Sequence, residues 1–285
     1  MSTRPKHRWR ATAINLGIVA ALLTGLSFLP PDTSLADRQS AGVLKLCVPP
    51  SFPPLVTGEE GAPGYDVELA GAIAAALDLK LSLNVLPSIG QDYNPRNWFL
   101  TRAQCDIVGG GVADTAQTRS FMQTVPTQAR TGWIGISPTG TMPPPGSVVA
   151  VLPGTSGLNR LALSGWLRQQ QLRAQLVRSP AELSRALTSG AAAAAVTERF
   201  LADGIDLDQT GFVPFWLEGE GFTSFPMALG VWKGDQTLKR AIDAAVSDLE
   251  ESGAMERLRE RYGVDADLAP ASTNQTPPSA VSPLE

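Results

Sequence analysis

The sequence predicts an α/β protein of two lobes, each built on a mostly parallel sheet flanked by helices. Three observations lead to this prediction. Short apolar runs alternate with helical segments twice along the chain, which is typical of parallel sheets with right-handed crossovers. A proline-rich stretch, residues 137–146, separates the two series and indicates a connection between lobes. The roughly 225 residues between the two ends of the chain are enough for two modest domains.

The first series contains strand-like apolar runs at residues 43–48, 81–86 and 106–110. Between the first two runs, residues 65–79 form a predicted helix. Its apolar side chains recur at helical spacing: Val67, Ala70, Ile73, Ala74 and Leu77.

The second series begins with a strand at 147–154, continues through a helix at 158–170 and reaches residues 181–197. A last strand, 227–232, precedes a helical stretch at 237–263 that Gly253 divides into two segments. The apolar stripe of this stretch consists of Leu238, Ile242, Ala245 and Leu249.

Residues 1–36 have the pattern of a secretory signal peptide, because four basic residues precede an apolar run and Ser34-Leu35-Ala36 offers small residues at the cleavage-determining positions. We expect a mature periplasmic chain that begins near Asp37. The alternative is an uncleaved anchor, since the apolar run could just span a bilayer. At the other end, residues 265–285 are rich in Pro, Ser and Thr, which predicts a disordered tail.

Charge and composition exclude several classes of function. Removal of residues 1–36 changes the 23 basic and 27 acidic side chains to 19 and 26, a net charge of −7. An acidic exported chain binds nucleic acid and anionic membranes poorly, so we expect neither partner. The only histidine, His7, leaves with the signal peptide. The mature chain therefore contains no Ser-His-Asp triad and no histidine-bound metal, and we expect no cofactor.

Two cysteines remain after export, Cys47 in the first predicted strand and Cys105 just before the third. An even count in an oxidising compartment is compatible with a disulfide if the two strands are neighbours. Two buried free thiols are the alternative.

Three glycines, Gly109 to Gly111, follow the third strand and suggest a phosphate-binding turn. The details argue against a nucleotide site. Asp114 stands where a third spaced glycine is required, and no Gly-Lys-Ser/Thr follows.

The order of these pieces resembles the extracytoplasmic solute-binding proteins of ABC importers, specifically the amino-acid-binding family with the type II periplasmic binding protein fold. The matching stretches are LKLCVPPSFPPL, GYDVELAGAIAAALDL, CDIVGGGVADTAQTR, VAVLPGTSG and LGVWKGDQTLKRAIDAAVSDLEESGAMERLRERYG. In that family the chain crosses between lobes twice. The resemblance implies a first lobe of residues 37–140 and 223–264, and a second lobe of residues 141–222.

The resemblance also implies ligand contacts from charged and hydroxyl side chains. Arg119 corresponds to the arginine that binds the ligand carboxylate, although its spacing is one residue longer; a surface arginine is the alternative. Ser156, with Thr155, corresponds to a hydroxyl contact at a predicted helix N-terminus, or caps that helix only. Glu198 falls where the family has an aspartate for the ligand ammonium, or is an ordinary surface residue.

Aromatic and glycine positions complete the implied site. Phe52 corresponds to the aromatic that stacks on the ligand side chain, or is a core residue. Gly110, Gly111 and Ala113 replace hydroxyl residues of the ligand-facing turn, and Pro49 replaces an aspartate, so backbone N–H groups must bind in their place. Tyr93, Trp98 and Trp133 could also line the cleft, although packing is the commoner role of such residues.

The resemblance implies a monomeric, non-enzymatic receptor for a small amino-acid-like zwitterion, which it delivers to an ABC transporter permease. The cysteine pair is also similar to a subfamily associated with periplasmic quinoprotein alcohol dehydrogenases, so an accessory protein of such an enzyme is a second hypothesis. A third is a periplasmic dehydratase on the same fold, in which Glu198 would be the general acid or base.

Overall fold

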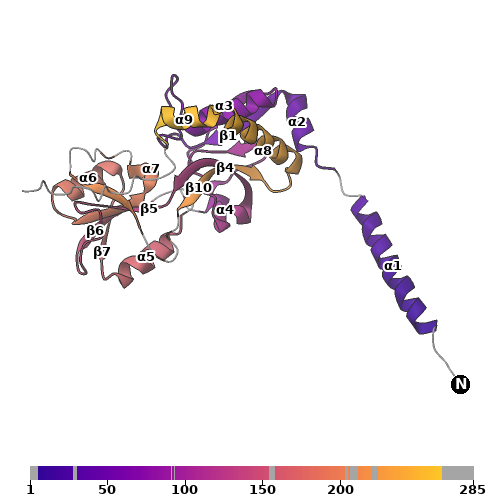
Figure 1. The fold of residues 1–285 in the computed structure, drawn as a ribbon, viewed down its shortest axis with the longest axis horizontal. Coiled ribbons are helices and arrows are strands. Elements are labelled where there is room, and N and C mark those ends of the chain that lie inside the picture. The colour runs from indigo at the N-terminus through magenta and orange to yellow at the C-terminus, as the bar shows by residue number, and fades with distance from the viewer. Residues whose placement is uncertain are drawn as a thin grey trace, which may run out of the picture. The chain divides into compact units, whose positions relative to one another are not determined.

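The computed structural model describes residues 6–27, 31–90, 92, 94–153, 158–202, 205, 211–217, 219, 222 and 224–264. The chain forms two units, residues 1–33 and 34–285. The first unit contains helix α1 (Lys6–Ser27), and the second contains the other described elements (Figure 1). None of the helices in the described ranges combines the length and the apolar character that a bilayer span requires.

The first sheet of the second unit has five strands. The central strand β3 (Ile107–Val108) is shorter than the sequence predicts and lies between β1 (Val43–Val48) and β10 (Phe225–Trp232). The edges are β2 (Lys80–Val85) and β4 (Met122–Thr131). Strand β1 runs parallel to β2 and β3, whereas β10 is antiparallel to β3 and β4.

The second sheet also has five strands, which confirms the predicted α/β fold with two sheets. Its order is β7 (Arg173–Leu176), β6 (Val148–Leu152), β8 (Ala194–Glu198), β5 (Trp133–Ser137) and β9 (Val213–Trp216). Strand β6 is parallel to its two neighbours, and β5 is antiparallel to both of its own.

The chain first crosses between the sheets at Gly132, because β4 belongs to the first sheet and β5 to the second. We expected this crossing at the proline-rich residues 137–146, with residues up to 140 in the first lobe. Strand β4 escaped the sequence analysis because it mixes polar residues with Pro126, a composition that an edge strand tolerates. The return crossing lies between β9 and β10.

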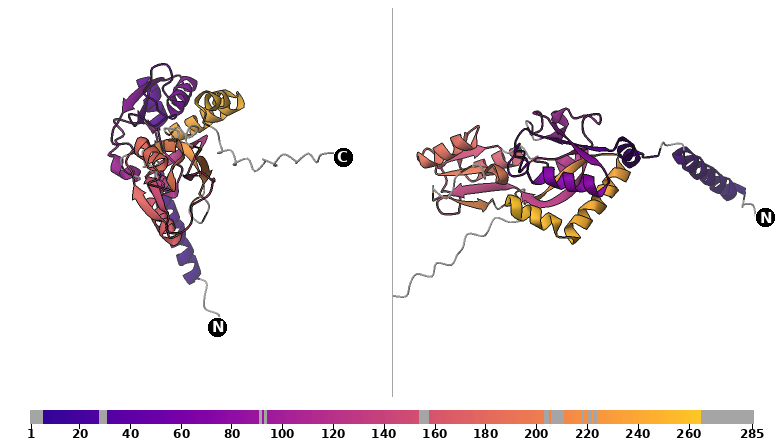
Figure 2. Two further views of the ribbon diagram at one scale, coloured as in Figure 1. Left: turned by 90° about the vertical axis from the view of Figure 1, so that its left-hand side faces the viewer. Right: turned by 90° about the horizontal axis from the view of Figure 1, so that it is seen from above.

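The first sheet separates two apolar clusters. One face packs against α3 (Tyr65–Ala76), α8 (Gln236–Glu251) and α9 (Ala254–Tyr262), which also contact one another (Figure 2). Gly253, at a φ of 69°, separates α8 from α9 as predicted. On the other face lies η1 (Pro95–Trp98), and α4 (Ala116–Phe121) precedes β4 directly.

The second sheet is likewise packed on both faces, by two clusters that alternate along its strands. Helix α5 (Arg160–Gln169) contributes to one cluster, and α6 (Pro180–Thr188) contributes to the other. A one-turn helix, α7 (Arg199–Ala202), follows β8 directly. The sequence starts α6 with a capping box, since Ser179 Oγ accepts the Glu182 N–H and Glu182 Oε2 accepts the Arg178 N–H.

Helix α2 (Ser34–Ala41), which the sequence analysis did not predict, opens the second unit and packs on α8. Ser34 Oγ accepts the Leu238 N–H at 3.2 Å, and Thr237 Oγ1 accepts the Leu35 N–H at 3.2 Å. Both bonds come from residues that precede the expected mature start near Asp37. They would therefore be lost if processing follows Ala36.

Cys47 and Cys105 form a disulfide, with Cα atoms 5.4 Å apart. Both residues are fully buried in the cluster opposite α3, together with Trp98, Val108 and Met122. The bond joins β1 to the turn that leads into β3. Because β1 and β3 are neighbours in the sheet, the two cysteines lie close together. The disulfide, rather than two free thiols, is therefore the alternative that the structure confirms.

Removal of this disulfide should lower the free energy of unfolding by about 4 kcal/mol, because it closes a loop of 58 residues in the unfolded chain. Urea unfolding of the oxidised protein and of the Cys47→Ala/Cys105→Ala variant measures the difference. Reduced wild type serves as the control and should unfold with the double variant. Equal midpoints for the oxidised protein and the variant would contradict the prediction.

Candidate functional site

The two crossings between the sheets lie side by side. Thr131, the last residue of β4, pairs with Phe225, the first residue of β10. The carbonyl of Gly132 accepts the Arg199 N–H at 3.1 Å. A Cβ at Gly132 would lie 2.8 Å from the Trp216 ring, so only glycine fits here without displacing that ring. Paired connections of this kind are where two lobes can rotate about a hinge.

Arg130 fastens the two crossings to each other. Its Nε and Nη2 donate to Ser224 Oγ at 3.0 and 2.8 Å, and Nη2 also donates to the Ser224 carbonyl at 2.8 Å. The Arg130 carbonyl in turn accepts from Arg199 Nη1 at 3.2 Å. Neither arginine was a candidate in the sequence analysis, because charge alone does not show that Arg199 is buried or that Arg130 bonds across the junction.

Glu198 is fully buried at the end of β8, beside the first crossing. The Thr131 hydroxyl donates to Glu198 Oε1, and the Leu201 N–H donates to Oε2 at 3.3 Å. The alternative that Glu198 is a surface residue is therefore wrong. Burial of a carboxyl group is costly, and these two donors offset part of that cost at the junction of the two lobes.

The glycine turn after β3 is shaped by its own packing. Gly110 has a φ of 72°, and a Cβ there would lie 2.5 Å from Pro49 Cδ. The Gly110 N–H donates to Asp66 Oδ2 at 2.7 Å, so this donor is engaged inside the protein, contrary to our expectation that it faces a ligand. In the described part of the chain the Gly111 N–H donates to no protein acceptor.

Ala113 is fully buried and forms an isolated bridge with Met227 of β10. The neighbouring Asp114 N–H donates to the Pro226 carbonyl at 2.8 Å. This pairing holds the end of the glycine turn against the return strand. Within the turn, the Gly110 and Gly111 N–H groups therefore differ, because only that of Gly110 has an acceptor among the described residues.

Asp66, at the start of α3, supports the turn from inside and was missed by the sequence analysis. It is fully buried, and its Oδ1 has no hydrogen-bond partner among the described residues. Burial raises the pKa of this carboxyl to about 7, against a smaller opposing effect of the Gly110 N–H. The available signal was the acidic residue directly after Gly64-Tyr65, where the chain enters the helix.

Phe52 lies over the glycine turn and also contacts the second lobe. A Cβ at Gly111 would lie 3.6 Å from its ring. On another side the ring meets Phe200 of α7 edge-on, with centroids 6.5 Å apart. Phe200 stands two residues after Glu198, so this aromatic pair links the turn of one lobe to the buried carboxylate of the other.

Arg119 lies in α4 and bonds to Asp114 rather than to Phe52 or Glu198. Its Nη1 donates to Asp114 Oδ1 at 2.6 Å, and its side chain is 53% exposed. Among the described residues, Arg119 makes no hydrogen bond or ion pair with the other predicted ligand residues. This partner is close in the sequence. Asp114 belongs to the segment before Arg119 that is one residue longer than the usual family spacing.

Other predicted positions are either packed or outside the described residues. Trp98 and Trp133 are buried in separate core clusters, which agrees with packing. Tyr93, Thr155 and Ser156 lie outside the described residues. Among the described residues, Asn159 caps α5, since its Oδ1 accepts the Leu161 and Ala162 N–H groups.

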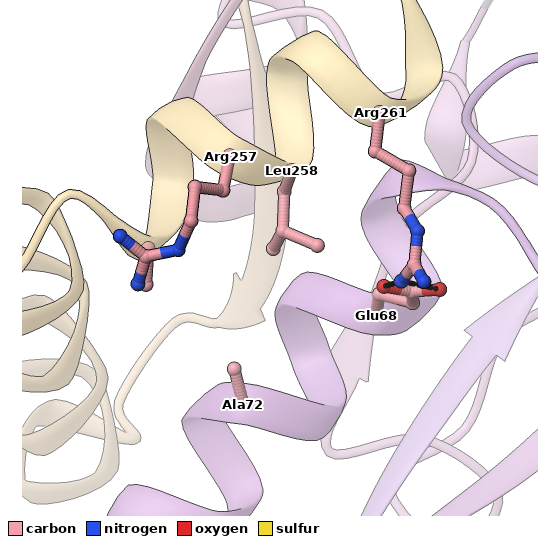
Figure 3. Close-up of a pocket in the computed structure, with 6 residues that line it drawn as sticks. Glu68, Ala72, Arg257, Leu258 and Arg261 are labelled. Carbon is pink, nitrogen blue, oxygen red and sulfur yellow. Dashed lines mark hydrogen bonds and ion pairs between the residues drawn. The ribbon is translucent and has the colours of Figure 1, made fainter.

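A surface groove of about 400 Å³ lies between α3 and α9 (Figure 3). Its lining residues are Glu68, Ala72, Ala254, Arg257, Leu258 and Arg261. Arg261 Nη1 donates to both oxygens of Glu68, at 2.9 and 2.6 Å, across one end of the groove. None of the predicted ligand residues lines it, so it is separate from the candidate site.

The raised pKa of Asp66 predicts a pH-dependent stability. The group is ionised in the unfolded chain above about pH 4 and in the folded chain above about pH 7. Folding therefore takes up a proton between these values, and stability falls as pH rises through this window, by roughly 4 kcal/mol in total. Asp66→Asn should flatten this dependence in urea unfolding from pH 4 to 8.

Asp248→Asn, which changes an exposed aspartate of α8, is the matched control and should keep the wild-type slope. If Asp66→Asn also kept that slope, the carboxyl would not titrate as inferred.

Comparison with known proteins places this geometry in a family. The family model of the bacterial extracellular solute-binding proteins, family 3, matches residues 44–265. A comparison with curated protein sequences finds no match.

Solved structures share the fold. An ancestral arginine-binding protein bound to arginine is 21% identical, with a TM-score of 0.58 over 78% of this chain and 98% of that one. An ABC uptake transporter substrate binding protein from Streptococcus pneumoniae with bound histidine is 15% identical, with a TM-score of 0.60 over 84% of this chain and 99% of that one. The ancestral amino acid-binding protein AncCDT-1, a precursor of cyclohexadienyl dehydratase, is 19% identical, with a TM-score of 0.59 over 80% and 99%. With a family match over most of its length and two sheets joined by paired crossings, this chain belongs to family 3 of the bacterial extracellular solute-binding proteins.

Proposed function

We propose that the protein is a periplasmic receptor for a small amino-acid-like zwitterion, which it delivers to an ABC transporter permease. The observation that carries this proposal is the buried carboxylate of Glu198 at the junction of the lobes, linked through Phe200 and Phe52 to the glycine turn. A zwitterion needs a carboxylate partner for its ammonium and N–H or guanidinium donors for its carboxylate. Residues from both lobes supply these groups.

Glu198 supplies the ammonium partner in this proposal. The Thr131 hydroxyl and the Leu201 N–H position its two oxygens, and a carboxylate forms strong charge-assisted hydrogen bonds with an ammonium. The bond to Thr131 also ties the carboxylate to the first crossing. A ligand on Glu198 is therefore bound at the place about which the lobes rotate.

The ligand carboxylate requires donors from the first lobe. The Gly111 N–H is one, and Arg119 is the second after it exchanges Asp114 for the ligand. That exchange costs little, because an ion pair with an arginine that is 53% exposed contributes at most about 1 kcal/mol. A ligand held by both lobes favours the closed form through its differential contacts.

Export through the N-terminal segment belongs to this proposal. The basic residues, the apolar run of α1 and the Ser34-Leu35-Ala36 site support secretion. The disulfide between Cys47 and Cys105 is in keeping with an oxidising compartment.

One observation favours a second candidate function. The same disulfide joins the two cysteines that resemble those of the quinoprotein dehydrogenase-associated subfamily. In that role the protein would bind a periplasmic dehydrogenase instead of a permease. Co-purification with a dehydrogenase, without any heat on titration with zwitterions, would favour the accessory role.

Isothermal calorimetry and thermal-shift measurements with the twenty amino acids and related organic acids test the receptor function. A ligand that binds only the folded state raises the melting temperature by mass action. We expect at least one zwitterion to bind, and its decarboxylated and deaminated analogues to bind much more weakly. Absence of heat with every zwitterion would refute the receptor function.

Glu198→Gln should weaken zwitterion binding by about 10- to 100-fold, because a charge-assisted bond to the ammonium becomes a neutral one. Calorimetry on the wild type and the variant measures the change. Glu251→Gln, an exposed glutamate of α8, is the control and should bind like the wild type. Unchanged affinity in a folded Glu198→Gln protein would remove Glu198 from the site.

A further inference from the structure

We propose that Phe200 sets the length of the ligand side chain and restricts the receptor to short zwitterions of the size of glycine, alanine or serine. This inference rests on the proposed function of the same site. It starts from the contact between the Phe200 ring, which the second lobe contributes, and Phe52, the ring on which a ligand side chain would stack.

The Phe200 ring occupies space beside Phe52 within the apolar cluster of the first lobe. The two centroids are 6.5 Å apart and the ring planes meet at 65°, an edge-to-face arrangement. Phe200 is 2% exposed and Phe52 is 5% exposed, so the rings bury each other and little of Phe52 remains for another group. Phe200 belongs to the same cluster as Leu46 and Leu229 of the first sheet, although α7 follows a strand of the second.

The Phe200 ring is also held in place from its other side. The Arg199 guanidinium carbon lies 4.7 Å from the ring centroid, a cation–π distance. Arg199 is itself fixed, since its N–H donates to the Gly132 carbonyl and its Nη1 donates to the Arg130 carbonyl. A ligand that displaced the ring would have to disturb the hinge contacts as well.

Phe200 is two residues after Glu198, in a one-turn helix whose Leu201 N–H donates to the Glu198 carboxylate. In this proposal a ligand has its ammonium on Glu198 and its side chain toward Phe52, so Phe200 lies beside that side chain. We expect a side chain of one carbon to end before the ring and a branched or long one to overlap it.

Calorimetry with alanine, leucine and arginine on the wild type and Phe200→Ala tests this inference. We expect the wild type to bind alanine at least about tenfold more tightly than leucine or arginine. Phe200→Ala should bind leucine at least about tenfold more tightly than the wild type does, with a much smaller change for alanine. If the alanine variant fails to fold, Phe200→Leu replaces it, because leucine keeps an apolar core residue without the ring. This variant should also bind leucine more tightly than the wild type does.

Phe222→Ala is the matched control, because Phe222 is 5% exposed and meets Trp166 edge-on at 5.3 Å within the second lobe. It should lose stability without gaining leucine affinity. Wild-type binding of leucine or arginine as tight as that of alanine, or no gain in a folded Phe200 variant, would overturn the role of Phe200 and leave the receptor function standing. If the wild type and every Phe200 variant bound no zwitterion, the receptor function itself would fail, and this inference with it.

Discussion

The pairing of Thr131 with Phe225 is the constraint on which the rest of the structure depends. Because β4 and β10 are neighbours in the first sheet, the chain must leave that sheet and return to it at the same place. Both connections then form one narrow junction, fastened by the bonds from Arg130 to Ser224. The strands of the second sheet lie within residues 133–216, and the chain enters and leaves that sheet through this junction.

Two buried carboxyl groups, those of Glu198 and Asp66, differ in how hydrogen bonds compensate their burial. Glu198 accepts from Thr131 and Leu201, so neighbouring donors compensate its burial. Asp66 accepts only the Gly110 N–H among the described residues, and burial raises its pKa to about 7. Two donors hold the Glu198 carboxyl, whereas Asp66 supports the glycine turn as a group that is only about half ionised near pH 7.

Much of the fold followed from periodicity, and the errors have identifiable causes. The helical spacing of Val67, Ala70 and Ile73 predicted α3 correctly, because these side chains share one buried face. Strand β4 was missed, since its polar residues are tolerated at a sheet edge, and with it the true crossing at Gly132 was missed. Asn159, the N-cap of α5, was not singled out, because several residues before this helix have side chains that can cap it.

The sequence by itself determined the alternation of strands and helices, which depends on residue type and local spacing. Its resemblance to a family identified Glu198 and Phe52 as candidates. Only the tertiary structure decided that Arg119 bonds to Asp114, that Asp66 holds Gly110, and that Phe200 reaches Phe52 from the other lobe. The contacts of Asp66 with Gly110 and of Phe200 with Phe52 join residues far apart in the sequence. The bond from Arg119 to Asp114 depends on the direction of the arginine side chain, which sequence spacing does not specify.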